Sequence, residues 1–159
     1  MLKRLSMMSA LAALLGTTAA AQDTLYFSAI PDDDETRLIE RFSAVADYLE
    51  DTLGIPVEYV PVKSYSASVT AFRNDQIQLA WFGGLSGVQA RLAVPNARAI
   101  AQGDEDQTCV TYFIANTETG LEASDAFPAG IEGLSFTFGA QTSTSGRLMP
   151  EFYIRQESG

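Results

Sequence analysis

Three hydroxyl side chains in succession, followed by a glycine, form the segment of the sequence best suited to bind an anion. They come directly after an apolar stretch with strand character and open a segment with helical spacing. The first N–H groups of a helix lack partners within the helix, and the helix dipole adds positive potential there. A single hydroxyl suffices to cap a helix, so an ordinary cap and an anion site both remain open. The candidate residues are Ser143, Thr144, Ser145 and Gly146.

A second group of candidate residues lies earlier in the chain, where two predicted strands end. Tyr65 and Ser66 follow one strand, and Trp81 and Phe82 close the next. Ligands of open α/β sheets bind outside the carboxyl ends of the strands. Because neighbouring strand residues face opposite sides of a sheet, we expect one of Trp81 and Phe82 to pack in the core. We predict that Tyr65, Ser66 and Phe82 line a ligand site.

The composition excludes several kinds of catalysis. The chain has no histidine and a single cysteine, Cys109, which removes a Ser-His-Asp hydrolase and a histidine-based zinc site. No nucleophile-elbow pattern surrounds Ser145, so we do not expect it to act as a nucleophile. The acidic residues 32–35 fit a helix start better than a metal site. We therefore predict neither an enzyme nor a bound metal or cofactor.

The first 21 residues have the pattern of a secretory signal. Lys3 and Arg4 precede an uncharged apolar run that is too short to span a bilayer, and three alanines end the segment. We expect residues 1–21 to be a signal peptide, Gln22 to begin the mature chain, and the protein to be periplasmic. The whole chain has a net charge of −10, and the signal holds two positive charges and no acid, so the remainder has −12. That charge argues against nucleic acid as a partner.

Strand and helix patterns alternate through the first half of the mature chain, which predicts an α/β layer with parallel strands. Helical spacing of apolar residues runs from Leu38 to a stop at Gly54. The other predicted helices are 65–74, 85–92 and 141–155, and the predicted strands are 24–30, 57–62, 78–82, 98–102, 108–116 and 134–139.

Four stretches in this order resemble the phosphate, phosphite and phosphonate-binding proteins of ABC transporters, a branch of the type II periplasmic binding proteins. These stretches are the opening strand into PDDDETRL, SYSASV, LAWFGGLSGVQAR and STSGRLMPEFYI. The resemblance implies two α/β lobes joined by hinge strands, with the ligand in the cleft between them. Residues 22–112 would form lobe one, 108–116 a hinge strand, and 113–159 the start of lobe two. Family chains run about twice this length, so we expect the second lobe to be truncated here.

The resemblance also implies a ligand and partners. In the family the oxyanion is held by the Ser-Thr-Ser run, which maps onto Ser143, Thr144 and Ser145, and by lobe-one groups that include Tyr65. Phe82 stands where the family often has tyrosine. The expected function is capture of a phosphonate, phosphite or phosphate-like oxyanion for an inner-membrane ABC permease, by a protein that is a monomer at full length. The alternative is a periplasmic sensing domain of the same fold that reports ligand occupancy to a signalling partner.

Overall fold

The computed structural model describes residues 24–127 and 129–158, so the predicted signal peptide lies outside the described residues. Three parallel strands form a sheet with the order β2-β1-β3. Each strand lies inside a range predicted from sequence. The strands are β1 (Leu25–Ala29), β2 (Val57–Tyr59) and β3 (Leu79–Trp81).

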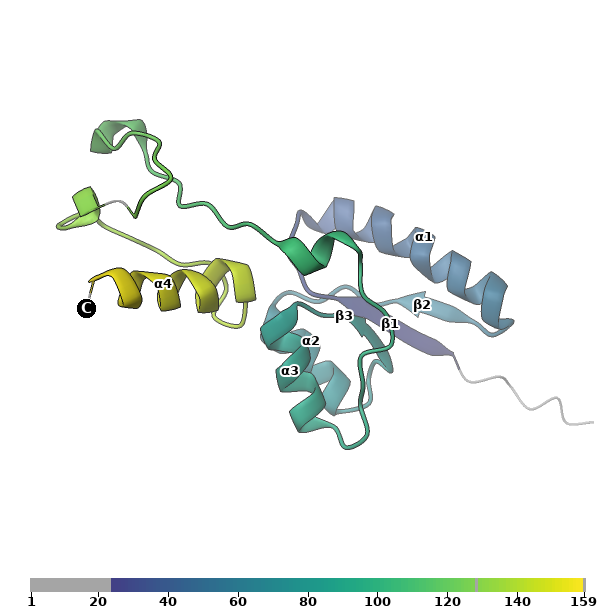
Figure 1. The fold of residues 1–159 in the computed structure, drawn as a ribbon. Coiled ribbons are helices and arrows are strands. Elements are labelled where there is room, and N and C mark those ends of the chain that lie inside the picture. The colour runs from purple at the N-terminus through teal and green to yellow at the C-terminus, as the bar shows by residue number, and fades with distance from the viewer. Residues whose placement is uncertain (1–23, 128, 159) are drawn as a thin grey trace, which may run out of the picture.

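Helix α1 (Glu35–Leu53) connects β1 to β2 and covers one face of the sheet (Figure 1). The Asp34 carboxylate caps its start by accepting a hydrogen bond from the Thr36 N–H at 3.0 Å. This geometry confirms that the acidic run begins a helix. The helix ends at Gly54, whose N–H donates to the Glu50 carbonyl oxygen. Both predicted ends of this helix are therefore confirmed.

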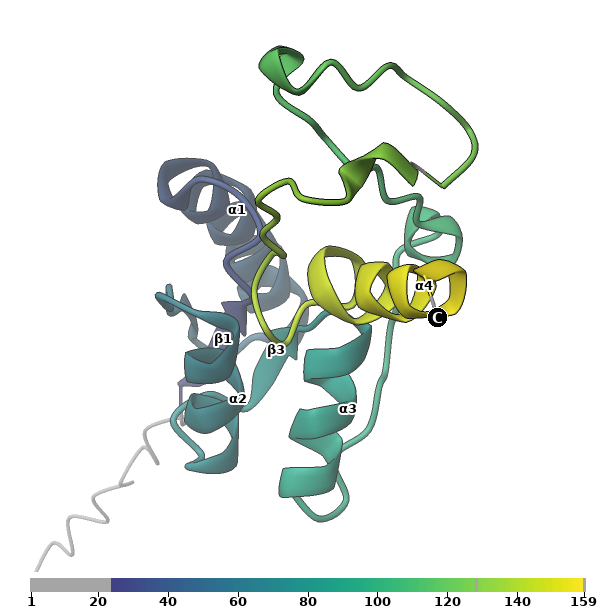
Figure 2. The same ribbon diagram turned by 90° about the vertical axis from the view of Figure 1, so that its left-hand side faces the viewer.

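Helices α2 (Tyr65–Arg73) and α3 (Gly84–Ala93) cover the opposite face. The right-handedness of the crossover connections explains why the helices lie on opposite faces. The connection from β1 to β2 moves in one direction across the sheet, and the connection from β2 to β3 moves in the opposite direction, past β1. The direction reverses, so the connecting helix must change face. Small buried side chains, Ser86 and Ala90, let α3 lie close to α2 (Figure 2).

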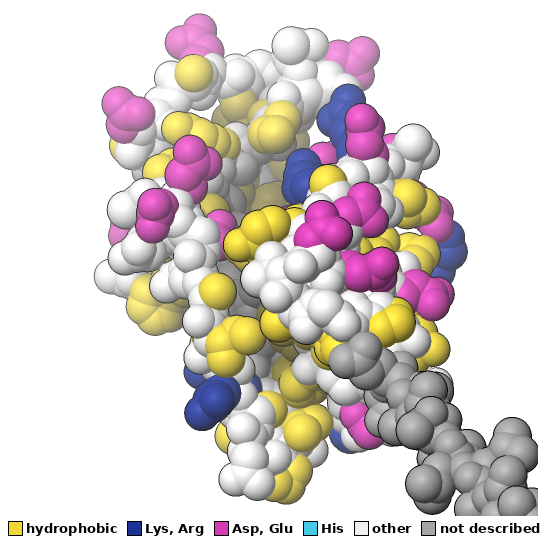
Figure 3. Space-filling model, turned by 90° about the vertical axis from the view of Figure 1, so that its right-hand side faces the viewer, with side chains coloured by type: hydrophobic (Ala, Val, Ile, Leu, Met, Phe, Trp, Pro, Cys, Tyr) yellow, Lys and Arg dark blue, Asp and Glu magenta, His cyan; other side chains and the backbone are white. Residues whose placement is uncertain are grey.

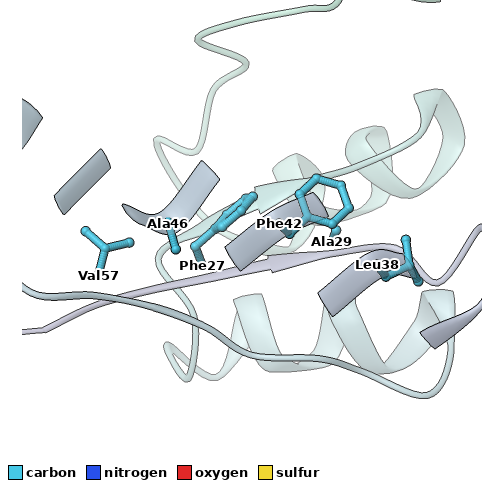
Figure 4. Close-up of a cluster of buried hydrophobic side chains, with 6 residues drawn as sticks. All are labelled: Phe27, Ala29, Leu38, Phe42, Ala46 and Val57. Carbon is cyan, nitrogen blue, oxygen red and sulfur yellow. The ribbon is translucent and has the colours of Figure 1, made fainter. Parts of the chain in front are cut away.

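The core lies between β1 and α1. Phe42 of α1 is 6% exposed and packs edge-to-face against Phe27 of β1, with ring centroids 5.6 Å apart. The Tyr59 ring stacks on Phe42 at 5.5 Å, and the Trp81 ring lies 6.5 Å from it. Figure 4 shows the buried side chains converging from the helix and the sheet. The fully buried members of this cluster are Phe27, Ala29, Leu38, Phe42, Ala46 and Val57.

Three predicted strands are wrong. Residues 98–102, 108–116 and 134–139 follow paths without strand pairing, and 105–108 form a short 3₁₀ helix. A strand needs a neighbouring backbone to hydrogen-bond with, and among the described residues none pairs with these segments. Their apolar side chains accordingly stay in solvent, as with Ile114 at 94% exposure and Tyr112 at 79%. An apolar pattern in the sequence is compatible with a strand, but it does not show whether a neighbouring strand is available for pairing.

The last helical segment returns to the sheet-forming part of the chain. It starts with a π-helical turn, η4 (Thr144–Leu148), which continues directly into α4 (Met149–Ser158). This agrees with the helix predicted at 141–155, shifted by three residues. Figures 1 and 2 show its beginning beside α3, although residues 94–143 lie between the two in sequence.

Acidic side chains are spread over much of the face drawn in Figure 3, in keeping with the net charge of −10. Short surface ion pairs use some of these acids, such as Lys63 with Glu35 at 2.6 Å and Arg41 with Asp33 at 3.3 Å. Exposed pairs of this kind contribute little to stability. Within residues 24–127 and 129–158, no helix combines the length and apolar character needed to cross a bilayer.

Phe42 holds the aromatic cluster together, so its truncation is the sharpest test of this core. Phe42→Ala should lower the free energy of unfolding by about 3–5 kcal/mol, because it removes a large buried ring and leaves a cavity. Tyr48→Ala, on the same helix but 67% exposed, should change it by less than about 0.5 kcal/mol. Urea denaturation followed through Trp81 measures both variants. Equal midpoints for the two would show that the cluster does not carry the stability.

Candidate functional site

The candidate site lies where the sheet order reverses. The chain leaves β1 toward α1 on one face and leaves β3 toward α3 on the other, so the carboxyl ends of these adjacent strands form the switch point at which ligands of such sheets bind. A hydrogen bond from the Ile30 N–H to the Trp81 carbonyl oxygen, 3.0 Å long, closes the ladder at this end. Gly83 follows as the N-cap of α3, with no side-chain cap bond. The backbone N–H groups at the start of α3 therefore need an acceptor from another segment of the chain.

That segment is the hydroxyl turn, which we define as Ser143 together with η4. The Ser143 Oγ accepts a hydrogen bond from the Gly146 N–H at 3.0 Å, and the Leu148 N–H reaches the Ser143 carbonyl oxygen at 3.0 Å. The latter spans five residues, which makes this a π-type turn, a feature that often occurs at functional sites. Of the two interpretations left open by the sequence, the ordinary cap is confirmed at Ser143, whereas anion binding stays a prediction.

Close backbone packing fixes the shape of the hydroxyl turn. The Gly139 N–H donates to the Gly146 carbonyl oxygen at 2.7 Å. A Cβ on Gly146 would lie 3.1 Å from the Ser143 Oγ and 3.3 Å from the Gly139 Cα. A side chain at position 146 would therefore press on both the cap and the preceding loop. Glycine at position 146 thus has a steric reason within the fold that is independent of any ligand.

The middle hydroxyl of the run reaches across to lobe-one elements. Thr144 Oγ1 accepts a hydrogen bond from the Leu85 N–H at 2.7 Å, over 59 residues of sequence. It thereby caps α3, whose own N-cap is a glycine. The third member, Ser145, is exposed, and its carbonyl oxygen accepts from Thr111 Oγ1 at 3.1 Å. The exposed Ser145 hydroxyl is free to face solvent or a ligand.

Tyr65 meets the first hydroxyl of the run. It is the first residue of α2, after the Ser64 cap, and its phenol lies close enough to the Ser143 side chain for that group to affect its pKa. Burial raises the pKa of the Tyr65 phenol above its ordinary value, the Ser143 side chain lowers it in part, and the negative charge of Asp32 raises it. Tyr65 therefore remains a protonated hydroxyl at neutral pH and can donate to an anion.

Ser66 and Phe82 have other immediate partners. The Ser66 hydroxyl lies 3.1 Å from that of Ser64, and both line an open groove of about 540 Å³ whose lining residues all lie between positions 60 and 77. The Phe82 ring packs edge-to-face on Phe72 of α2 at 5.6 Å, whereas Trp81 faces the α1 side. The two rings face opposite sides, as expected, but the prediction that one of them packs in the core is wrong, because Trp81 is 41% exposed and Phe82 is only half-buried. Ligand contacts by Ser66 and Phe82 stay predictions.

Arg147 supplies positive charge beside the hydroxyl turn, although its head group is already engaged. It pairs with Glu151 at 2.8 Å, and its guanidinium lies 4.1 Å from the Phe138 ring centroid. Glu151 is also bonded to Arg155, and the hydrogen bond from Arg155 is the main reason that the pKa of this carboxyl lies below its usual value. The backbone amides and hydroxyls thus remain the groups best placed to receive an anion.

Sequence reasoning missed the partners that hold the hydroxyl turn. Neither the Leu85 amide nor Thr111 was a candidate, because a backbone donor and an exposed threonine carry no distinguishing signal in a single sequence. The glycines at 83 and 84 were the one available hint, since glycines after a strand leave a helix start uncapped. In the described part of the chain, His, Cys, Asp and Glu do not form a group of three that could hold a metal ion.

Comparison with known proteins decides the family. The family model described as "ABC transporter, phosphonate, periplasmic substrate-binding protein" matches residues 27–159. The chain belongs to this family of periplasmic substrate-binding proteins. The family assignment made from the four stretches is thereby confirmed.

Two curated relatives support the same family assignment. A probable ABC transporter phosphite binding protein, PhnD1, from Prochlorococcus marinus (strain MIT 9301) is 43% identical over 134 residues, which cover 83% of this chain and 45% of the relative. The phosphonates-binding periplasmic protein of Escherichia coli (strain K12) is 25% identical over 152 residues, or 92% of this chain and 45% of the relative. The chain thus spans about half the length of the curated relatives it matches.

A solved structure supports the fold. The structure of PhnD1 from Prochlorococcus marinus (MIT 9301) in complex with methylphosphonate superposes with a TM-score of 0.68 and 39% identity, over 85% of this chain and 50% of that chain. The predicted fold class, the α/β architecture of type II periplasmic binding proteins, is confirmed by this match and by the parallel sheet. The lobe boundaries remain predictions.

The raised pKa of Tyr65 predicts a loss of stability at alkaline pH. The phenol ionises near pH 10 in the unfolded chain and at higher pH when folded. Above about pH 10 the unfolded state therefore holds fewer protons, so stability falls as pH rises. Tyr65→Phe should make this decline shallower, and adding Tyr59→Phe should flatten it further, because burial also raises the pKa of Tyr59. The test is the denaturation midpoint of the wild type, of Tyr65→Phe and of the double variant, measured between about pH 8 and 11. A parallel fall of the midpoint in all three proteins would contradict the prediction.

Proposed function

We propose that this protein is a periplasmic solute-binding component of an ABC importer and that its ligand is a small tetrahedral oxyanion of the phosphonate or phosphite class. The observation that carries the proposal is the hydroxyl turn, in which Ser143, Thr144 and Ser145 open a helix beside the phenol of Tyr65. Helix amides, hydroxyls and a protonated phenol are all donors, and together they suit an anion with several acceptor oxygens. The relatives named for phosphite and phosphonate binding support this choice.

The residues divide the task in the following way. Ser145, which is exposed, and the amides of the hydroxyl turn would bind the oxygens directly, while Tyr65 would donate from the side of α2. Ser66, Phe82 and Gly146 complete the proposed site, with Gly146 keeping the turn narrow. Ligand binding would bring lobe one, residues 22–112, and the part from 113 onward together by a hinge motion. We propose export through residues 1–21, delivery to an inner-membrane permease, and a role without catalysis, metal or cofactor.

The phosphonate class is tested by calorimetric titration of the purified chain with methylphosphonate, phosphite, phosphate and sulfate. We expect heat from methylphosphonate or phosphite. PhnD1 from Prochlorococcus marinus, solved with methylphosphonate, serves as the positive control. If PhnD1 binds and this chain gives no heat with any of the four anions, the oxyanion proposal for this chain is wrong.

The direct role of the exposed hydroxyl is tested separately. Ser145→Ala should weaken methylphosphonate binding by about 10- to 100-fold, because hydrogen bonds to charged groups contribute about 1.5–3 kcal/mol. Ser158→Ala, at the far end of the same helical segment, is the matched control and should leave the affinity unchanged. Calorimetry measures the affinity of both variants for methylphosphonate, and equal affinities would show that the Ser145 hydroxyl does not contact the ligand.

A further inference from the structure

Two arginines and one glutamate meet where the hydroxyl turn continues into α4 (Figure 1). Arg147 Nε lies 2.8 Å from Glu151 Oε2. Arg155 binds the other carboxylate oxygen, Oε1, through a terminal guanidinium nitrogen at 2.7 Å and through its Nε at 3.1 Å. Each oxygen of the carboxylate therefore has its own guanidinium. These three residues, which we call the Arg–Glu–Arg triad, carry one net positive charge.

The triad contains all the basic side chains of the later part of the chain. Residues 99–159 include nine acidic residues but only two basic ones, Arg147 and Arg155. Both bind the same glutamate, and Arg147 belongs to the hydroxyl turn itself. The positive charge of this acidic segment is thus concentrated at the helix start that carries the candidate ligand groups.

The two inner members of the triad are partly shielded from water. The side chain of Arg147 is 36% exposed and that of Glu151 is 27% exposed, whereas Arg155 is 76% exposed. The Arg147 guanidinium also lies 4.1 Å from the centroid of the Phe138 ring. Partly buried charges are screened by salt less than exposed ones. The charge of Glu151 can therefore influence an anion bound at the neighbouring turn.

We propose that Glu151 sets the charge of the candidate site and restrains its affinity for doubly charged anions, because it cancels one of the two arginine charges beside the hydroxyl turn. Without Glu151, two uncompensated guanidinium groups would add to the positive end of the helix dipole. With Glu151, one positive charge remains to offset the negative charge that Asp32 brings near Tyr65. Glu151 acts on the ligand through the field of the triad and does not touch it. This inference rests on the proposed function, since it concerns the anion held at the turn.

The charge role is tested by calorimetry with methylphosphonate in mildly alkaline solution, where this ligand is a dianion. Glu151→Gln raises the triad charge by one unit and should tighten binding by about threefold or more. Arg155→Gln lowers the charge by one unit and should weaken binding by a similar factor. The double variant Glu151→Gln/Arg155→Gln has the wild-type charge and should return to within about twofold of the wild-type affinity.

Two controls separate this role from a purely structural one. Glu157→Gln removes the same charge from an exposed position further along α4 and should change the affinity by less than about twofold. Raising the salt from about 0.1 M to 1 M shortens the Debye length from about 10 Å to 3 Å, so the differences between the variants should shrink. Urea denaturation shows whether each variant is folded.

The outcomes that contradict the inference are distinct from those that contradict the proposed function. If Glu151→Gln and the double variant both bind more weakly than the wild type, the ion pairs only support the shape of the turn, and the charge role is wrong. Equal affinities in all the variants would overturn it as well. If the wild type binds none of the anions, the proposed function fails and this inference fails with it.

Discussion

At 2.7 Å, the hydrogen bond from the Leu85 amide to Thr144 Oγ1 joins two helix starts that lie far apart in the sequence. The rest of the site depends on it. Ser143 lies near Tyr65 because the hydroxyl turn is held against α3, and α3 follows a glycine N-cap that has no side chain to accept from the Leu85 amide. An uncapped helix start loses roughly 1 kcal/mol relative to a capped one. One side chain thus stabilises α3 and places the candidate ligand groups.

The sheet provides the setting for that contact. Its order, β2-β1-β3, sends α1 to one face and α3 to the other, so the carboxyl ends of β1 and β3 lie at the switch point of the sheet. The buried β1 strand and the aromatic cluster around Phe42 fix the sheet against α1. This rigid core keeps the starts of α2 and α3 in register with each other. Precision at the site therefore comes from packing that lies elsewhere in the molecule.

The sequence correctly predicted the elements that depend on local signals in the chain. Amphipathic spacing predicted α1 with its ends, and the three short strands fell within their predicted ranges because each pairs with a neighbour within residues 25–81. The hydroxyl run was recognised because three hydroxyls before a helix exceed a cap's needs. Residues 108–116 and 134–139 failed as strands because pairing partners are not encoded locally. The Thr144 contact could not be foreseen for the same reason, since its partner is a backbone amide.

The same geometry explains how a chain with a net charge of −10 can offer an anion site. The starts of α2, α3 and η4 meet at the candidate site, as the contacts of Tyr65 with Ser143 and of Leu85 with Thr144 show. Each helix start carries roughly half a positive charge. An anion at the proposed site would be attracted by these helix starts, whereas exposed acids more than a Debye length of about 8 Å away are largely screened.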